Sequence, residues 1–359
     1  MSPRPALALW TSSPRTWYLA RMRIEANASL RHRNTFAVEA TAKWFAEVRS
    51  ADDFRALLSD PRVAGERKLV LGGGSNILFS RDFAGLVVKN SIPGIEVLAE
   101  SEEHVRVRAA AGEAWHDLVM FCVERDLGGL ENLSLIPGLV GAAPIQNIGA
   151  YGVDMAETCE SVEALHLATG ERALFAAADC EFGYRDSIFK RKHRGQFLIT
   201  GVTLRLSRTP SFRIAYGDLQ RTLDEMRVSE LTVKAVSDAV IRIRSAKLPD
   251  PRVAGNAGSF FQNPVIAGED FERLAVRHPR LPGYPQEDGA MRVPAGWLIE
   301  ACGWKGKTLG RAGVHAAHAL VLVNRGGATG EEVLRLAAAI QRSVQETFGI
   351  DLVPEVNLV

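Results

Sequence analysis

The sequence predicts an α+β fold, and three features support this prediction. Strand-like and helix-like apolar patterns follow one another along the 359 residues without the strict strand–helix–strand alternation of a parallel sheet. Two long segments, 231–247 and 331–348, carry apolar residues at helical spacing. Hydrophobic residues make up 47% and charged residues 24% of the chain, which is enough apolar material for a normal core. At roughly 150 residues per domain, we expect two or three domains.

Short apolar runs or apolar–polar alternation mark the expected strands. In chain order, these segments are 68–71, 77–79, 86–88, 104–110, 161–167 and 197–206. A further strand is expected at 350–359, and Pro354 within it predicts a sheet edge or a bulge, because proline cannot donate to the ladder.

Three helices are expected. The first covers 115–125 and stops before a Gly-Gly pair. The second covers 231–247 and ends before Pro249, because a proline disfavours helical geometry in the residue before it. The third covers 331–348 and carries acidic residues in its first turn, where they complement the helix dipole.

Residues 1–33 differ from the rest of the chain. Six arginines precede or surround the first acid, Glu25, and the apolar run 6–10 is too short for the core of a signal peptide. We expect 1–33 to be a poorly ordered extension, with Met1 or Met22 as the start, and a targeting arm is the alternative.

The charge balance argues against several partner classes. Lys and Arg number 43 and Asp and Glu 42, so the net charge of +1 gives no global field for nucleic acid or an anionic membrane. No stretch approaches the ~20 apolar residues of a membrane span.

The cysteine and histidine spacings argue against a metal site and a disulfide framework. The four cysteines include no C-x-x-C pair, which favours a reduced, intracellular compartment. His315 and His318 have no neighbouring carboxylate, so no metal is expected.

A Gly-Gly-Gly-Ser-Asn segment, 72–76, follows the expected strand 68–71 directly. Consecutive glycines let backbone N–H groups converge on an anion such as a pyrophosphate. The segment is neither a P-loop nor a G-x-G-x-x-G motif. Taken alone, an ordinary hairpin turn is the better explanation.

The segment 129–152, GLENLSLIPGLVGAAPIQNIGAYG, has Glu131 as its only charge. Structureless loops beyond ~12–15 residues are usually functional or disordered, and surface loops are usually polar. A Gly-rich apolar loop can satisfy its backbone and cover its side chains by wrapping a large, flat ligand. A buried turn network at a domain junction is the alternative, and we favour ligand binding.

Three single residues could carry chemistry. Arg185, in FGYRDS, could clamp a carboxylate through two parallel hydrogen bonds; alternatively, it is a surface residue paired with Asp186. Ser259, between glycine and two phenylalanines, could donate a proton; alternatively, it forms a serine turn. Glu355, in an apolar segment, would have a raised pKa suited to proton transfer; alternatively, it is an exposed acid at a sheet edge.

Seven segments, in order, closely resemble the UDP-N-acetylenolpyruvoylglucosamine reductases, over almost the whole chain from about Asn34. They are IPGLVGAAPIQNIGAYG, FGYRDSIFK, YGDL, KLPDP, GNAGSFFQNP, AGWLIE and PEV. The resemblance implies a two-subdomain FAD-binding fold of the vanillyl-alcohol-oxidase type, 34–95 and 96–247. An α+β substrate-binding domain, 248–359, with a C-terminal catalytic strand would follow.

The resemblance also implies an activity. NADPH would reduce UDP-N-acetylglucosamine enolpyruvate to UDP-N-acetylmuramate through non-covalent FAD, in peptidoglycan precursor synthesis. The enzyme would be a cytoplasmic monomer with no nucleic-acid or membrane partner. An oxidase or dehydrogenase on the same fold, and a non-catalytic flavin- or nucleotide-sugar-binding protein, are the competing hypotheses.

Site residues follow from the same resemblance. Arg185 and Glu355 would polarise the substrate carboxylate, and Ser259 would donate a proton to the neighbouring carbon. The implied FAD contacts are Gly72, Gly73, Gly74, Ser75, Asn76, Pro137, Gly138, Gly141, Ala142, Gln146, Asn147, Gly149, Ala150 and Tyr151. The implied substrate contacts are Tyr184, Tyr216, Lys247, Asn263 and Tyr284. Asn357 stands where some relatives carry a basic residue.

Overall fold

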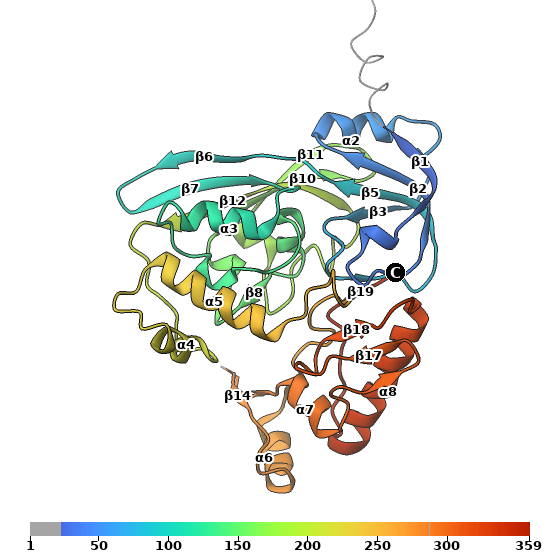
Figure 1. The fold of residues 1–359 in the computed structure, drawn as a ribbon. Coiled ribbons are helices and arrows are strands. Elements are labelled where there is room, and N and C mark those ends of the chain that lie inside the picture. The colour runs from blue at the N-terminus through green and yellow to red at the C-terminus, as the bar shows by residue number, and fades with distance from the viewer. Residues whose placement is uncertain (1–22, 287) are drawn as a thin grey trace, which may run out of the picture.

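The computed structural model describes residues 23–286 and 288–359 and consists of two sheets with a C-terminal α+β part below them (Figure 1). The first sheet has the order β1-β2-β5-β3, with β1 antiparallel to β2 and both β2 and β3 parallel to β5. Its strands are β1 (Ile24–Ser29), β2 (Thr41–Val48), β3 (Lys68–Leu71) and β5 (Phe83–Asn90).

The second sheet is antiparallel throughout and has the order β11-β10-β12-β7-β6. Its central strand, β12, is buried along nearly its whole length. The edge strand β6 is largely exposed and carries acids, which discourage pairing with another chain. The strands are β6 (Ile95–Glu100), β7 (His104–Ala110), β10 (Cys159–His166), β11 (Arg172–Ala176) and β12 (Phe197–Ser207).

Helices cover these sheets and connect them to the loops of the site. α2 packs on the first sheet, while α3 and α5 lie below the second (Figure 1). Thr232 begins α5 by accepting a hydrogen bond from the Ala235 N–H, which satisfies one of the unpaired donors of the first turn. The helices are α2 (Ala51–Leu58), α3 (Trp115–Val123), α4 (Leu219–Glu225) and α5 (Val233–Lys247).

Short elements build the loops that connect these strands and helices. They are the 3-10 helices η1 (Arg31–Arg33), η2 (Glu131–Leu133), η3 (Val140–Ile145), η4 (Met155–Glu157) and η5 (Ala177–Cys180), and the strands β4 (Ile77–Leu78), β8 (Gly149–Ala150) and β9 (Val153–Asp154).

The C-terminal part packs around the long helix α8, which begins with a capping box between Thr329 and Glu332 and ends at Gly349 in the left-handed conformation. Its helices are α6 (Gly268–Arg277), α7 (Ala295–Ala301) and α8 (Gly330–Phe348). Its strands are β13 (Val265–Ile266), β14 (Tyr284–Pro285), β15 (Met291–Arg292), β16 (Thr308–Leu309), β17 (Ala312–Val314), β18 (Leu322–Asn324) and β19 (Asn357–Leu358).

One hydrophobic core joins the first sheet to the C-terminal part. It contains Phe36 and Phe79 from the first segment and Phe260, Phe261 and Leu336 from the last, all fully buried. The chain end returns to this region, where β19 pairs in parallel with β4 (Figure 1). The residues around Glu355 are therefore held against the segment 72–76.

Most of the predicted elements are confirmed, among them the helices at 115–125, 231–247 and 331–348 and the strands at 68–71 and 104–110. The prediction for 1–33 is wrong from residue 23 onward. β1 pairs with β2, Leu30 is fully buried, and Arg33 forms an ion pair with Glu25, so packing orders a segment whose charge pattern looked like that of a tail. Residues 1–22 lie outside the described part of the chain.

The expected final strand is also shorter than predicted. Only Asn357–Leu358 pairs along a strand, and Pro354 forms a single bridge with Phe261. Proline supplies no N–H for a ladder, so the backbone before it stays irregular.

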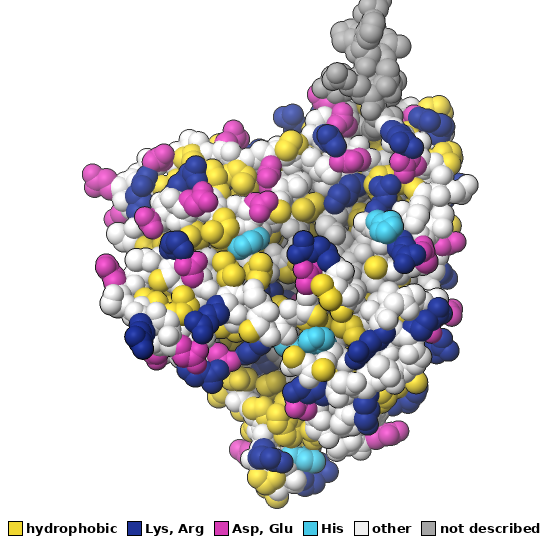
Figure 2. Space-filling model, viewed as in Figure 1, with side chains coloured by type: hydrophobic (Ala, Val, Ile, Leu, Met, Phe, Trp, Pro, Cys, Tyr) yellow, Lys and Arg dark blue, Asp and Glu magenta, His cyan; other side chains and the backbone are white. Residues whose placement is uncertain are grey.

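The surface carries charges of both signs, intermingled on the face shown in Figure 2, in keeping with the net charge of +1. Among the helices of the described residues, none combines the length and the apolar character that crossing a bilayer requires. Within the same part of the chain, His, Cys, Asp and Glu form no cluster that could hold a metal ion.

Candidate active site

A cavity of about 720 Å³ lies where the glycine-rich segment after β3 faces the loop around η3. This volume falls in the range of roughly 300–1,000 Å³ that is typical of small-molecule sites. Two hydrogen bonds tie the walls together: Ser75 Oγ donates to Pro137 O over 3.3 Å, and Asn76 Nδ2 donates to Gln146 Oε1 over 2.6 Å. The two segments that the sequence marked as unusual therefore build one site.

Ten of the predicted cofactor residues line this cavity: Gly72, Gly73, Gly74, Ser75, Asn76, Pro137, Gly138, Gly141, Ala142 and Gln146. The glycines let the two backbones come close together. A Cβ atom at Gly73 would lie 3.2 Å from Gly138 Cα. The segment 72–76 is thus a close backbone contact across a cavity and not a free hairpin turn.

The rest of the cavity wall fits a flavin dinucleotide. Trp115, Ile148 and Phe189 give it apolar surface, and Lys190 and Arg194 give it positive charge. A ligand with a flat ring and a pyrophosphate needs both, together with backbone donors. The residues present therefore fit FAD.

The other four predicted cofactor residues lie in the neighbouring turn at β8 and not in the cavity wall. Asn147 fixes this turn, because its Nδ2 donates to Gly183 O over 3.0 Å and its Oδ1 accepts from the Ala156 N–H over 3.0 Å. Gly149 and Ala150 form β8, and Tyr151 follows with a positive φ of 48°.

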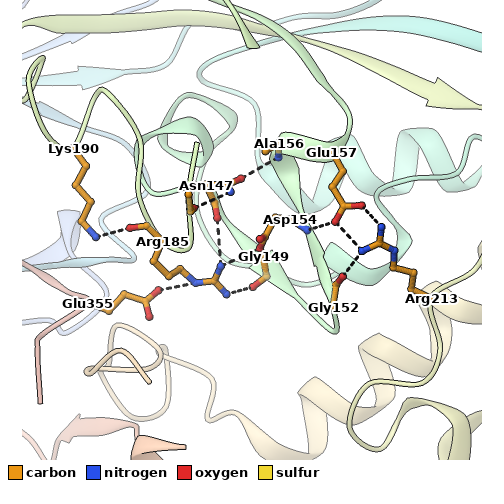
Figure 3. A network of polar contacts seen from close by, with 11 residues as sticks. Asn147, Gly149, Gly152, Asp154, Ala156, Glu157, Arg185, Lys190, Arg213 and Glu355 are labelled. Carbon is orange, nitrogen blue, oxygen red and sulfur yellow. Dashed lines mark hydrogen bonds and ion pairs between the residues drawn. The ribbon is translucent and has the colours of Figure 1, made fainter. Parts of the chain in front are cut away.

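Arg185 lies in a tight turn with a φ of 53°, a conformation that costs free energy for a non-glycine residue. Its guanidinium faces three acceptors of the β8–β9 segment: Asn147 O at 3.4 Å, Asp154 Oδ1 at 3.2 Å, and Gly149 O. Its Nε faces Glu355 Oε1 at 3.4 Å (Figure 3). The side chain is only 16% exposed, so its position is fixed before any ligand binds.

The backbone at Glu355 is paired with the segment 259–261, which contains Ser259, because the Glu355 N–H donates to Phe260 O over 2.8 Å. Its side chain is 16% exposed. Burial raises the pKa of the Glu355 carboxyl, and the positive charges of Arg185 and Lys190 offset this only in part. The carboxyl therefore holds its proton to higher pH than an exposed glutamate does.

Ser259 is partly buried and lies one residue before Phe260, whose carbonyl binds Glu355. It forms a bridge with Val321, and the following Phe260 and Phe261 are fully buried. The segment that contains Ser259 therefore lies beside the segment that contains Glu355. The Glu355 segment then continues into β19.

The predicted substrate residues lie at the junction between the second sheet's helices and the C-terminal part. Tyr216 and Tyr284 stack with their ring centroids 6.3 Å apart and their planes at 24°, although each is half exposed. Lys247, at the end of α5, forms an ion pair with Asp218. Asn263 Oδ1 accepts from the Ala295 N–H over 3.0 Å at the start of α7.

Tyr184 is covered by a cation, because the Arg292 guanidinium carbon lies 3.9 Å from its ring centroid. Burial raises the pKa of the Tyr184 hydroxyl. Arg292 belongs to β15, which pairs with β14, the strand of Tyr284. Arg292 therefore connects the β14–β15 hairpin to Tyr184.

Two alternatives from the sequence are wrong. Arg185 is not a surface residue paired with Asp186, because Asp186 pairs with Arg191 over 2.8 Å. Glu355 is not an exposed acid at a sheet edge.

Sequence reasoning missed Lys190 and Asp154. Lys190 Nζ donates to Arg185 O over 2.8 Å, and its charge acts on Glu355. Lys190 ends the FGYRDSIFK segment, so a search for charges within that segment could have found it. Nothing in the local sequence around Asp154 points to Arg185.

Two family profiles match the chain. An FAD-binding domain matches residues 42–173, and the C-terminal domain of UDP-N-acetylenolpyruvoylglucosamine reductase matches residues 250–359. They confirm the predicted fold class, an FAD-binding part followed by an α+β domain.

Known proteins are similar over nearly the full length. UDP-N-acetylenolpyruvoylglucosamine reductase of Burkholderia vietnamiensis (strain G4 / LMG 22486) is 53% identical over 324 residues, which is 90% of this chain and 93% of that protein. The protein of the same name from Burkholderia multivorans (strain ATCC 17616 / 249) is 52% identical over the same shares of both chains.

The crystal structure of UDP-N-acetylenolpyruvylglucosamine reductase (MurB) from Thermus caldophilus has the same fold. It superposes with a TM-score of 0.66 at 24% identity, over 94% of this chain and 99% of that one. With relatives at 53% identity over nine-tenths of its length, the chain belongs to the UDP-N-acetylenolpyruvoylglucosamine reductase family.

Proposed function

We propose that this protein reduces UDP-N-acetylglucosamine enolpyruvate to UDP-N-acetylmuramate, with NADPH as reductant and non-covalent FAD as cofactor, in peptidoglycan precursor synthesis. The observation that carries this proposal is the pairing of Arg185 with a buried Glu355 beside the flavin-sized cavity, with the Ser259 segment hydrogen-bonded alongside. The family relationship supports the same reaction. FAD held between the segments 72–76 and 137–146 would supply the hydride chemistry that links NADPH to the enolpyruvyl methylene carbon.

The substrate double bond belongs to an enol ether, which is electron-rich and accepts a hydride poorly. The reaction becomes possible when electrons are drawn into the adjacent carboxylate, which then gains negative charge in the transition state. Fixed donors at that carboxylate lower the barrier. Arg185 suits this role, because the loop carbonyls and Asp154 hold its guanidinium in place in advance.

Glu355 assists as a neutral acid in this proposal. Since burial raises the pKa of its carboxyl, the protonated form can donate a hydrogen bond toward the developing charge. An ionised Glu355 would instead repel that charge.

Ser259 gives a proton to the carbon next to the carboxylate. A serine hydroxyl is a weak acid, so it can do this only toward a strongly basic carbon and without competing water. The fully buried Phe260 and Phe261 behind it support such a dry environment.

The nucleotide part of the substrate binds at the domain junction in this proposal. Lys247 provides a point charge for the diphosphate, which would take the place of Asp218 in the present ion pair. Tyr216 and Tyr284, already stacked, close over the substrate, and Asn263 and Tyr184 complete the binding surface. We place the enzyme in the cytoplasm as a monomer, and the free thiols of its four cysteines are in keeping with a reduced compartment.

Anaerobic stopped-flow absorbance tests the proposal. The purified protein is mixed with NADPH and then with UDP-N-acetylglucosamine enolpyruvate. Bleaching of the yellow colour by NADPH, followed by rapid recolouring with the enol ether, is the expected result. Bleaching without recolouring would contradict the substrate assignment, and a protein that takes up no FAD would contradict the cofactor assignment as well.

A further inference from the structure

Arg185 is held from one side by the short β8–β9 segment, as Figure 3 shows. Two of its contacts go to backbone carbonyls, Asn147 O and Gly149 O, and these are neutral. The third goes to Asp154 Oδ1 at 3.2 Å and is an ion pair. On the opposite side, Arg185 faces Glu355. One guanidinium therefore lies between two carboxyl groups from distant parts of the chain.

The Asp154 carboxylate reaches Arg185 across Gly149, and its side chain is 39% exposed on the other side. A Cβ atom built on Gly149 would lie 1.6 Å from Asp154 Oδ1 and 2.8 Å from Arg185 Nη1. A glycine at this position therefore makes the space in which the pair forms. Glu157 fixes the same segment from the other side, since its Oε1 accepts from the Asp154 N–H over 3.1 Å and its Oε2 pairs with Arg213 over 2.8 Å (Figure 3).

Asp154 adds a negative charge next to the groups that influence the ionisation of Glu355. The charged groups that act on the Glu355 carboxyl are the cations Arg185 and Lys190, and Glu355 in turn acts on the hydroxyl of Tyr184. Asp186 lies near Lys190 but is itself paired with Arg191. Asp154 contacts Arg185 directly, so its negative charge offsets the cation that would otherwise favour ionised Glu355.

We propose that Asp154 is a positioning residue for the reaction: it fixes the Arg185 guanidinium for the substrate carboxylate and takes up part of its charge, so that Glu355 remains a proton-bearing group. This inference rests on the proposed function, since it assumes that Arg185 and neutral Glu355 act together in reduction of the enol ether.

The test compares Asp154→Asn, Asp154→Glu and Glu157→Gln with the wild-type protein. Asp154→Asn keeps a hydrogen-bond acceptor and removes the charge. The two half-reactions are followed by stopped flow over a range of pH, with FAD content and thermal midpoint as checks on folding. Asp154→Asn is expected to leave flavin reduction by NADPH unchanged and to slow reoxidation by the enol ether about 10- to 100-fold.

The pH profile gives a second readout, which a purely structural role would not move. Without the negative charge of Asp154, ionised Glu355 is better stabilised, so its pKa falls. The reoxidation rate declines on the alkaline side of its pH profile, and this alkaline limb is then expected to shift to lower pH by about one unit. Asp154→Glu restores the charge and should recover most of the rate and the original limb.

Glu157→Gln is the matched control, because it removes a carboxylate charge from the same segment but keeps the Oε1 that accepts from the Asp154 N–H, and Glu157 does not contact Arg185. It is expected to behave like the wild type. A wild-type rate and pH profile in Asp154→Asn would overturn the inference, and so would an equal loss in Glu157→Gln. If wild-type protein reduced by NADPH is not reoxidised by the enol ether, the proposed function itself has failed.

Discussion

Gly74 shows how closely the cofactor segment is packed against the beginning of the fold. It has a φ of 68°, and a Cβ atom on it would lie 2.1 Å from Arg33 O and 2.8 Å from Asn34 Cα. Both neighbours are backbone atoms, so no side-chain rotation can relieve the contact. Its carbonyl also accepts from the Thr35 N–H over 3.0 Å, which holds the two segments together.

The cost of Gly74→Ala can be worked from these distances. The left-handed conformation costs roughly 1–2 kcal/mol for a residue with a Cβ. Overpacking adds about 1–3 kcal/mol, since the segment must move by ~1 Å to restore van der Waals contact. A shift of this size also breaks a hydrogen bond from a backbone N–H of the segment 72–76 to a charged group of the ligand, which is worth about 1.5–3 kcal/mol. The affinity for FAD should therefore fall roughly 10- to 150-fold.

Gly349→Ala is the matched control. Gly349 has the same φ of 68°, but no atom lies within 4 Å of its built Cβ. Thermal unfolding and FAD titration of both variants separate backbone strain from packing. At about 1 °C per kcal/mol for a chain of this length, we expect a loss of about 1–2 °C for Gly349→Ala and about 2–5 °C for Gly74→Ala. Equal losses, or unchanged FAD affinity in Gly74→Ala, would refute the packing argument.

Three further predictions concern the reaction. Ser259→Ala should spare flavin reduction by NADPH and slow reoxidation by about 10²- to 10⁴-fold in stopped flow; equal slowing of both halves would contradict a proton-donor role. Glu355 has a raised pKa, so activity should be present below that pKa and decline as pH rises through it. Glu355→Gln cannot ionise and should lack this alkaline limb in the pH–rate profile, and a retained limb would assign it to another group. Lys247→Ala should weaken binding of the nucleotide substrate by about tenfold, or ~1.4 kcal/mol, in a titration of the oxidised protein, whereas unchanged affinity would contradict the diphosphate assignment.

Local sequence patterns predicted the long elements well. The helix expected at 331–348 is found at Gly330–Phe348, because helical periodicity and the capping signals around Thr329 and Gly349 all agree. The strand expected at 104–110 is found with the same bounds. The segment 23–33 was misjudged because an edge strand gains its order from its neighbour, and its own composition does not show this.

The motifs of the site were also visible in the sequence, but their arrangement was not. Arg185, Ser259 and Glu355 each lay in a segment with an unusual local composition, so they could be named as candidates. Whether Arg185 was free or paired, and with which acid, depended on contacts between residues far apart in the chain. The contacts of Arg185 with Asp154 and with Glu355 are of this kind.

The sequence by itself determined the class of fold, the residue types available to the site and, through seven ordered segments, the family. Only the tertiary structure decided that β19 returns to β4, that Glu355 is buried beside Arg185, and that Asp154 lies on the other side of that arginine. The physical reason is that periodicity and capping act over a few residues, whereas burial and charge pairing depend on which surfaces the core brings together.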